Sequence, residues 1–414
     1  MPRKNPLRMK LLLFAHVPPP HHGQSAAVKL MLENFGGDRR KQKASPSPFG
    51  IECYHVNARF SKTLEDVGEL QAGKVLLILF YCLQAIWCRF RYGVEIFYYV
   101  PAPGKPVALY RDWLVMLLCR PFFKKIILHW HGGGLAKWLE TVGSIRTRSF
   151  TYRLMKNADL SIVLTEFGRR DAEKLTAKRI TIVSSGVPDP CPQFNENILL
   201  HRRARTAALK NLLSGQTAPA NDAEAVIRVL FVATCSREKG LFDAVEGVAL
   251  ANEKLAAKKS PLLFRLELIG AFASAAEDTE MRELIRQRNL QGVVEHLGFV
   301  SEERKEQALR DADVFCFPTY YNAENLPNSL MEAMGFGLPI VTTRWRAVAG
   351  MFPPDYPGLV DIKSPQQVAD AIPLLAASGV AETLRENFLC RFTLERHLAN
   401  IAEAIRSVEA AEFK

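Results

Sequence analysis

A chain of 414 residues is longer than one hydrophobic core usually supports, so we expect two domains of roughly 200 residues each. Apolar residues make up 48% and charged residues 23%, which excludes a disordered chain. Residues 1–200 contain 29 Lys and Arg against 15 Asp and Glu, whereas residues 201–414 contain 25 against 28. The basic first half indicates nucleic acid, an anionic membrane or a phosphorylated substrate as partner, unless it is only a solvated face.

The eight cysteines show no CxxC spacing, and most of them lie in apolar runs. This pattern favours buried thiols in a reducing compartment over disulfides or a zinc site. At the N-terminus, the apolar run Met9–Ala15 is short and leads into prolines, so we expect a strand there rather than a signal peptide.

Short apolar runs alternate with helical stretches along the chain, which is typical of parallel α/β layers. The strands predicted in the first half are Lys10–Ala15, Val94–Val100, Ile126–Trp130, Leu160–Leu164 and Ile180–Val183. Those predicted in the second half are Ile227–Ala233, Phe264–Ile269, Val293–Leu297, Val314–Phe317 and Pro339–Thr342. Two sets of five strands predict two doubly wound, Rossmann-like domains.

Polar, turn-rich stretches set the expected domain boundaries. We expect a basic loop over Gly36–Gly50. The first domain is predicted to end at Pro188–Gln193, and Ser214–Ala223 is predicted to be part of a linker. We therefore expect a first domain over residues 1–193, a linker over 194–225 and a second domain over 226–390. A helix in residues 391–414 could return to the first domain.

The longest apolar segment, Val75–Cys88, is shorter than the roughly 20 residues of a spanning helix. Arg89 and Arg91 follow it, and Trp113–Lys125 is a second basic, apolar stretch. Val75–Cys88 is therefore either a buried helix, the more common outcome, or a helix that rests on a membrane surface.

The segment Val314–Thr343 carries the clearest candidate site. A buried strand is followed by a polar loop with Glu324, and then by a helix that contains Glu332. Both carboxylates are expected at the mouth of the sheet, where open α/β sheets bind ligands. The amides of Asn325 and Leu326, at the helix N-terminus, suit an anion. Two carboxylates beside a phosphate-binding turn fit a nucleotide sugar.

Three further segments carry candidate residues. Lys239 precedes Gly240 at a helix start and suits a diphosphate, with Arg237 as a second cation. In Ile126–Gly134 a strand enters a glycine-rich turn, where His131 is the preferred functional histidine and His129 the reserve. The HxH spacing has no third metal ligand nearby.

These segments resemble the retaining GT-B glycosyltransferases, especially family 4 (glycosyl transferases group 1). Glu324 and Glu332 match the EX7E region, although Asn325 stands where the family usually has glycine. Lys239-Gly240 and His131-Gly132 match two further motifs, and Thr234 stands where many members have arginine. The first loop, with Gly23, Gln24 and Ser25, is similar to the family's loop near the donor phosphates and the acceptor.

The resemblance implies a GT-B fold, in which the two domains face a cleft, and assigns the site residues. Glu324 and His131 would act at the donor sugar, Glu332 on the ribose, and Lys239, Arg237, Asn325, Leu326 and Gly23 on the rest of the donor. Gln24 and Ser25 would lie on the acceptor side. The family implies transfer with retention and without a cofactor or bound metal.

The expected donor is a nucleoside-diphosphate sugar, and the expected acceptor is a saccharide or a lipid-linked hydroxyl of bacterial surface polysaccharide or glycolipid synthesis. The protein would be cytoplasmic and peripheral on the inner face of the plasma membrane, held by anionic lipid. Alternatives are a nucleotide-sugar epimerase or phosphorylase of the same fold, or a basic nucleic-acid-binding protein. The sequence shows no nucleic-acid-binding motif, so we expect no nucleic-acid partner.

Overall fold

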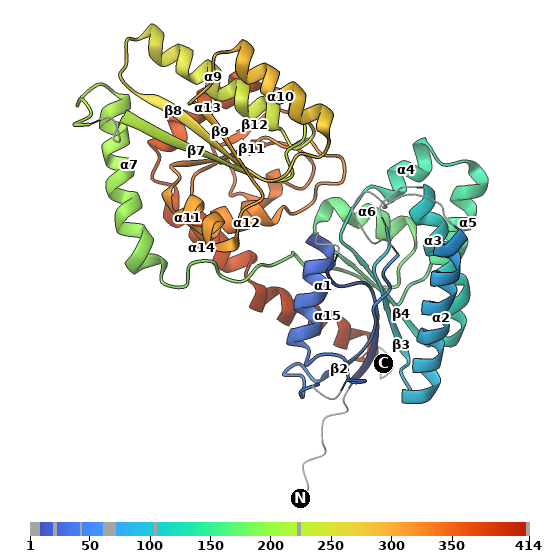
Figure 1. Cartoon of the computed structure of the whole chain (residues 1–414). Helices are drawn as coiled ribbons and strands as arrows, with labels where there is room; N and C mark the ends of the chain where they lie inside the picture. Colours follow the sequence, from blue (N-terminus) through green and yellow to red (C-terminus); the bar gives the residue numbers. More distant parts are fainter. Residues whose placement is uncertain are drawn as a thin grey trace, which may run out of the picture. The chain divides into compact units, whose positions relative to one another are not determined.

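The computed structural model describes residues 9–19, 23–41, 44–60, 72–102, 106–221 and 225–410. The chain forms two compact units, shown in Figure 1. Unit 1 consists of Met1–Ser185 and Glu395–Lys414, and unit 2 consists of Gly186–Leu394. Each unit contains one parallel sheet of six strands with helices on both faces. The predicted α/β class with two Rossmann-like domains is therefore confirmed.

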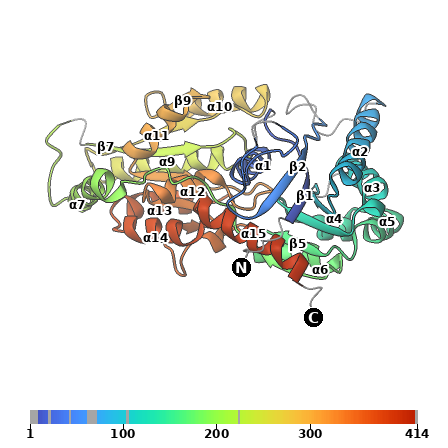
Figure 2. The same cartoon turned by 90° about the horizontal axis from the view of Figure 1, so that it is seen from below.

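The sheet of unit 1 has the strand order β2-β1-β3-β4-β5-β6. Its strands are β1 (Met9–Phe14), β2 (Ile51–Val56), β3 (Ile96–Tyr99), β4 (Lys125–Trp130), β5 (Leu160–Val163) and β6 (Ile180–Ile182). The helices on one face include α2 (Ala72–Tyr92), α3 (Pro106–Cys119) and α5 (Ile145–Met155), whereas α1 (Gly23–Asn34) and α15 (Leu394–Ala410) lie on the other, as Figures 1 and 2 show. The remaining helices are η1 (Arg120–Phe122), α4 (Leu135–Thr141) and α6 (Glu166–Lys174).

The sheet of unit 2 has the strand order β12-β11-β10-β7-β8-β9. Its strands are β7 (Val226–Val232), β8 (Leu263–Ile269), β9 (Val294–Gly298), β10 (Val314–Phe317), β11 (Ile340–Thr343) and β12 (Leu359–Val360). The helices are η2 (Asn195–Leu199), α7 (Leu200–Leu213), α9 (Leu241–Ala257), α10 (Ala275–Gln287), α11 (Glu302–Asp311), α12 (Asn328–Gly335), η3 (Ala349–Met351), α13 (Pro365–Ala376) and α14 (Ala381–Arg391). The order reverses between β7 and β10, so their carboxyl ends form the switch point where such sheets bind ligands.

Each sheet has one strand more than the five predicted. In unit 2 the extra strand is the two-residue β12, and in unit 1 it is β2, whose sequence IECYHV mixes polar and apolar residues. The predicted loop before β2 is partly ordered against it, because Asp38 forms a bridge to Cys53 and accepts hydrogen bonds from Arg40. Arg40 also donates to the carbonyl of His55.

The segment expected to be a linker, residues 194–225, instead contributes η2 and α7 to unit 2. Arg202 of α7 is only 6% exposed, and its guanidinium donates to the carbonyls of Phe336, Ala312 and Leu309 at 2.7, 2.9 and 2.8 Å. Leu209 of α7 lies in the hydrophobic core of unit 2. The sequence predicts a linker here because these partners of Arg202 lie more than a hundred residues away along the chain.

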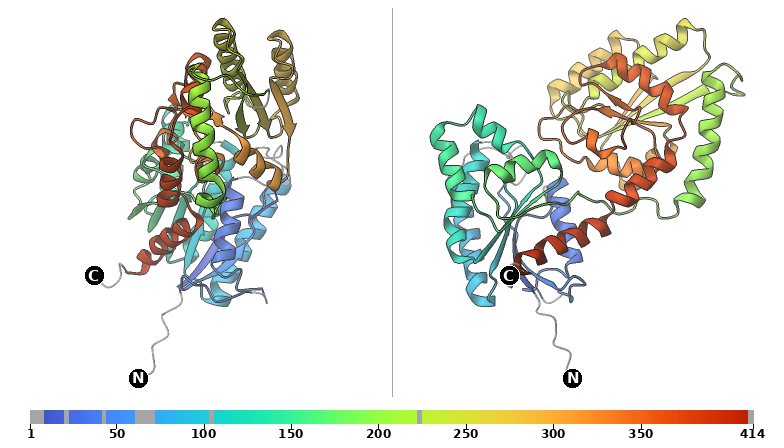
Figure 3. Two further views of the ribbon diagram at one scale, coloured as in Figure 1. Left: turned by 90° about the vertical axis from the view of Figure 1, so that its left-hand side faces the viewer. Right: turned by 180° about the vertical axis from the view of Figure 1, so that it is seen from behind.

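The C-terminal helix α15 belongs to unit 1, apart from its first residue. His397 Nδ1 lies 2.7 Å from the carbonyl oxygen of Ser184, and the Arg179 guanidinium donates to the carbonyl of Ser407. Figure 3 shows α15 beside the unit 1 sheet in two further views. Its apolar face, which includes Leu398, Ile401 and Ile405, is buried, and this burial fixes the end of the chain to the first unit.

The place of α7 in the core can be tested with two neighbouring arginines. Arg202→Met should lower the free energy of unfolding of unit 2 by roughly 2–5 kcal/mol, because buried carbonyls lose their donor. Arg203, whose side chain is 59% exposed and pairs with Glu382, is the matched control. Arg203→Met should cost less than about 1 kcal/mol in the same urea titration. Equal effects of the two variants would contradict the packing described for α7.

Candidate active site

The turn between β7 and α9 places Lys239 at the end of β10. Gly240 caps α9 with a φ of 81°, and a Cβ at this position would lie 2.2 Å from the carbonyl oxygen of Pro318. Only glycine fits both this conformation and this space. The close approach brings the residue before it, Lys239, alongside the loop that follows β10.

That loop holds Glu324 in an ion pair with Lys239. Glu324 is 8% exposed, and its Oε2 lies 2.7 Å from Lys239 Nζ and 3.1 Å from Thr319 Oγ1. The backbone N–H of Tyr320 donates to the carbonyl of Glu238 at 2.8 Å, which joins the loop to the Lys239 turn. Lys239 Nζ also lies 4.6 Å from the centre of the Tyr321 ring. The structure therefore brings together the two residues that the sequence analysis places at the sugar and the diphosphate.

Glu332 lies on α12 and has a lysine partner of its own. Its Oε1 is 3.0 Å from Nζ of Lys305 on α11, which also binds the exposed Glu302 at 2.6 Å. Burial raises the pKa of Glu332 above its usual value, and the Lys305 cation opposes that shift. The first turn of α12 has Pro327 as its cap and no side-chain cap. Asn325 and Leu326, buried and half-buried, stand directly before this helix start.

Arg237, the second predicted cation, is engaged with α10. Its guanidinium pairs with Glu280 and lies 4.0 Å from the centre of the Phe242 ring, and its backbone N–H donates to Glu277 at 2.7 Å. Within the described residues, Lys239 rather than Arg237 is thus the cation in contact with Glu324. The partners of Arg237 lie about forty residues along the chain, and no local spacing indicates them.

In unit 1 the two histidines of the glycine-rich turn have different surroundings. His129 is inside β4 and 1% exposed, and its Nδ1 forms a hydrogen bond with the Tyr98 hydroxyl. Burial holds the pKa of His129 well below its usual range. His131 is half-buried just beyond the strand, with its ring centre 4.3 Å from that of His129. Position and burial therefore favour His131 as the histidine that meets a ligand.

The glycine-rich turn is closed by a carboxylate. Asp171 accepts hydrogen bonds from the backbone N–H groups of Gly134 and Ala136, each at 2.7 Å. These contacts supply the start of α4 with a cap. The turn consequently positions His131, and its amides at Gly134 and Ala136 already have an anionic partner.

The first-loop candidates lie in the first turn of α1. Gly23 is exposed, Gln24 is half-buried and Ser25 is buried. The preceding residues 20–22 lie outside the described part of the chain.

Two contacts of the unit 2 site could not be found by sequence reasoning. Lys305 is 27 residues from Glu332, and only the fold brings α11 beside α12. Trp345 donates its indole N–H to the carbonyl of Tyr321 at 3.0 Å and braces the loop. No local sequence motif predicts either contact.

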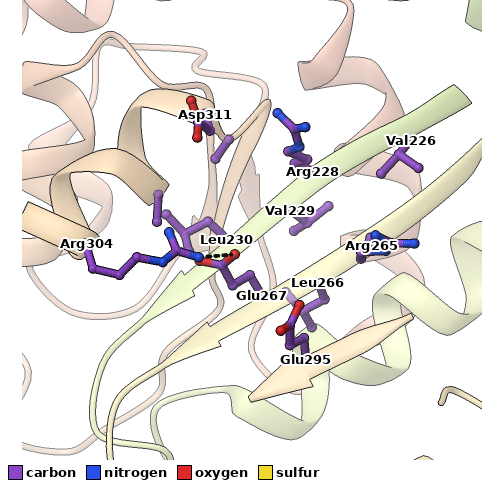
Figure 4. A pocket seen from close by; sticks show the side chains of 12 residues that line it. Val226, Arg228, Val229, Leu230, Arg265, Leu266, Glu267, Glu295, Arg304 and Asp311 are labelled. Carbon is purple, nitrogen blue, oxygen red and sulfur yellow. Dashed lines mark hydrogen bonds and ion pairs between the residues drawn. The ribbon is translucent and has the colours of Figure 1, made fainter. Parts of the chain in front are cut away.

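A separate groove of about 500 Å³ lies on the unit 2 sheet beside α11 (Figure 4). Arg304 and Glu267 form an ion pair of 3.0 Å across it, and Arg228, Arg265 and Glu295 also line it. Arg265 and Glu267 alternate along β8 with its buried residues Phe264, Leu266 and Leu268, whereas Arg304 comes from α11. None of the candidate site residues lines this groove, so we assign it to the solvated part of the sheet.

Comparisons with known proteins find a family match in unit 2 and fold similarity over nearly the whole chain. Residues 218–393 match the family model described as Glycosyl transferases group 1, a segment that contains Lys239, Glu324 and Glu332. The whole matched segment lies within unit 2. The chain is 34% identical to the putative colanic acid biosynthesis glycosyltransferase WcaL of Escherichia coli over 121 residues. These residues make up 28% of this chain and 28% of WcaL. The chain therefore matches less than a third of that relative's length.

Solved structures match nearly the whole chain. Sucrose-phosphate synthase from Thermosynechococcus elongatus aligns with a TM-score of 0.65 at 18% identity, covering 98% of this chain and all of the other. HepE from Anabaena, solved in complex with UDP and glucose, aligns with a TM-score of 0.64 at 14% identity, covering 96% of this chain and all of HepE. Both likenesses support the GT-B fold.

The two histidines can be separated by stability. His129→Ala should lower the free energy of unfolding of unit 1 by roughly 1–3 kcal/mol, because the buried Tyr98 hydroxyl loses its partner. His131→Ala should lower it by less than about 1 kcal/mol and stay folded, so its activity can be measured directly. Thermal unfolding of both variants checks the order. A larger loss for His131→Ala would contradict the structural role assigned to His129.

Proposed function

We propose that this protein is a retaining glycosyltransferase that moves a sugar from a nucleoside diphosphate to an acceptor hydroxyl. The observation that carries the proposal is the Lys239–Glu324 ion pair at the carboxyl ends of β7 and β10, inside the segment that matches Glycosyl transferases group 1. A cation and a carboxylate at a sheet switch point supply one group for a diphosphate and one for sugar hydroxyls.

The donor would lie along the helix starts of unit 2. Lys239, with the N-termini of α9 and α12, would stabilise the diphosphate as its charge develops. Glu324 would contact the sugar, the amides of Asn325 and Leu326 the diphosphate, and Glu332, oriented by Lys305, the ribose hydroxyls. UDP and glucose in the HepE structure support a donor of this class.

The chemistry would need neither a cofactor nor a bound metal. The leaving phosphate would accept the proton of the acceptor hydroxyl, so no strong side-chain base is required. His131 is the candidate catalytic residue of unit 1, and Gly23 a candidate donor contact. Gln24 and Ser25 are candidates for the acceptor side. Arg237 would contribute less than Lys239 because Glu280 and the Phe242 ring already engage its guanidinium.

The acceptor would be a saccharide or a lipid-linked saccharide used to build a bacterial surface polysaccharide. The similarity to WcaL, named for colanic acid biosynthesis, supports this class. An enzyme that acts on a lipid-linked acceptor would be cytoplasmic and peripheral at the inner face of the plasma membrane. An epimerase or phosphorylase of the same fold would act on the nucleotide sugar without an acceptor.

The direct test is a thermal-shift screen of nucleoside-diphosphate sugars, followed by product analysis. A true donor raises the midpoint of unfolding by mass action. Product analysis with and without a saccharide acceptor should then give a glycoside of retained anomeric configuration only when acceptor is present. Conversion of the donor alone to another nucleotide sugar would identify an epimerase, and no stabilisation by any donor would contradict the proposal.

Lys239→Ala should reduce kcat/KM by about 30- to 1000-fold, or roughly 2–4 kcal/mol, because developing charge on the diphosphate loses its cation. Arg237→Ala is the comparison, and its loss should be clearly smaller. Steady-state kinetics on both variants, after circular dichroism has shown them to be folded, decides between the cations. A larger loss for Arg237→Ala would move the diphosphate role to that residue.

Glu332→Gln should weaken donor binding by roughly tenfold to a hundredfold, because the ribose hydroxyls lose a charged acceptor. Glu302→Gln is a matched control, since Glu302 also pairs with Lys305 but its side chain is 68% exposed. Isothermal titration calorimetry with the donor should show unchanged affinity for the control. Unchanged affinity for Glu332→Gln as well would refute the ribose assignment.

A further inference from the structure

Helix α2 is apolar on two opposite sides. Ile78, Cys82, Ala85 and Cys88 are buried in unit 1. The other side carries an apolar stripe, defined as Leu76, Phe80, Leu83, Trp87 and Phe90, whose exposed fractions lie between 52% and 69%. These positions alternate at spacings of four and three, so they form one continuous row about 21 Å long.

The stripe continues onto the neighbouring elements. The Phe90 ring lies 6.1 Å from that of Phe122 in η1, and Leu117 on the adjacent α3 is 54% exposed. Large contiguous apolar patches on soluble proteins mark surfaces that bind another apolar surface. The interpretation of Val75–Cys88 as a wholly buried helix is therefore wrong for its outer side.

The elements around the stripe are also strongly cationic. We define the outer layer as α2, α3, η1 and α5, all on one face of the unit 1 sheet (Figures 1 and 3). Its sequence contains eight Lys and Arg but a single acidic residue, Asp112, which is fully buried and paired with Arg111. Arg91, Arg146 and Arg153 are among its exposed cations. Just outside the layer, Glu95 pairs with both Arg89 and Lys124.

We propose that the outer layer docks on the surface of an anionic lipid bilayer, with the apolar stripe inserted among the headgroups of one leaflet. Apolar and aromatic side chains flanked by arginines match that interface, where the rings contact acyl chains and the guanidinium groups meet lipid phosphates. Charge selects this occupant over a second copy of the chain, because pairing two such layers would bring like charges together.

The same helix does not cross the bilayer in this arrangement. Over Val75–Tyr92, α2 is long and apolar enough to span a membrane by length and composition, and it is the one described helix that is. Spanning would require Ile78, Cys82, Ala85 and Cys88 to leave the core of unit 1. Insertion of the outer stripe keeps those contacts intact.

The docking surface rests on the peripheral membrane position proposed above and names the residues that would hold it, but it is tested without any substrate, so it can fail separately from the transferase activity. The full chain is sedimented with phosphatidylcholine vesicles, with or without phosphatidylglycerol. Binding should require phosphatidylglycerol and should weaken with added salt, because salt screens the exposed cations. No binding to either vesicle, or equal binding to both, would overturn the proposal.

Variants test which surface binds. Leu76→Ser combined with Leu83→Ser should weaken binding to anionic vesicles by about tenfold or more, since two inserted side chains are lost. Leu374→Ser, which alters a leucine of α13 that is 56% exposed in unit 2, is the matched control and should bind like the parent. Thermal unfolding confirms that each variant is folded. Parent-like binding of the folded double variant would overturn the assignment.

Trp87 supplies a readout of depth. Brominated lipids should quench its fluorescence on binding, and Trp87→Phe should still bind while losing most of the quenching. Trp113 of α3 belongs to the same layer, so quenching that persists when both Trp87 and Trp113 are replaced by Phe would place another surface in the membrane. A dimer in light scattering that dissociates in the double leucine variant would show that a second copy covers the stripe instead.

Discussion

The contact between Gly240 and Pro318 is the constraint on which the unit 2 site depends. Two loops from separate strands meet there at a distance that leaves no room for a Cβ atom. The approach places Lys239 within 2.7 Å of Glu324, and without it the carboxylate, 8% exposed, would lack its cation. A buried carboxylate with no partner is costly, so the glycine, the lysine and the glutamate stabilise one another's positions.

The carboxylate of Glu332 is also positioned by a lysine. Glu332 has Lys305, as Glu324 has Lys239, so a lysine orients each candidate carboxylate, and Glu332 shares its lysine with Glu302. A lysine ammonium carries three donors, so Lys239 can keep Glu324 and still donate to a phosphate oxygen. An entering diphosphate would therefore extend an existing network rather than compete with a carboxylate for its cation.

The sequence predicted those parts of the molecule that local patterns determine. Buried parallel strands read as apolar runs, so ten of the strands were predicted, whereas β2 was missed because its polar residues break the pattern. The role of α7 could not be predicted, because Arg202 binds carbonyls that only the fold brings near. Glu324 and Glu332 lie on one loop and the helix after it, so a local pattern suffices to propose them, whereas Lys305 and the acidic partners of Arg237 come from distant parts of the chain.

The structure shows where the excess positive charge of the first half of the chain lies. In unit 2 many cations on the helix surfaces have acidic partners, as in the pairs Arg282–Asp278 and Arg286–Glu283 of α10. In unit 1, α5 has three arginines and no acidic residue, and α2 likewise has cations only. The excess positive charge thus lies in the same helix layer as the exposed apolar stripe. Composition alone could report the two features but not that they share a face, and it is their shared face that favours an anionic lipid surface over a solvated basic region.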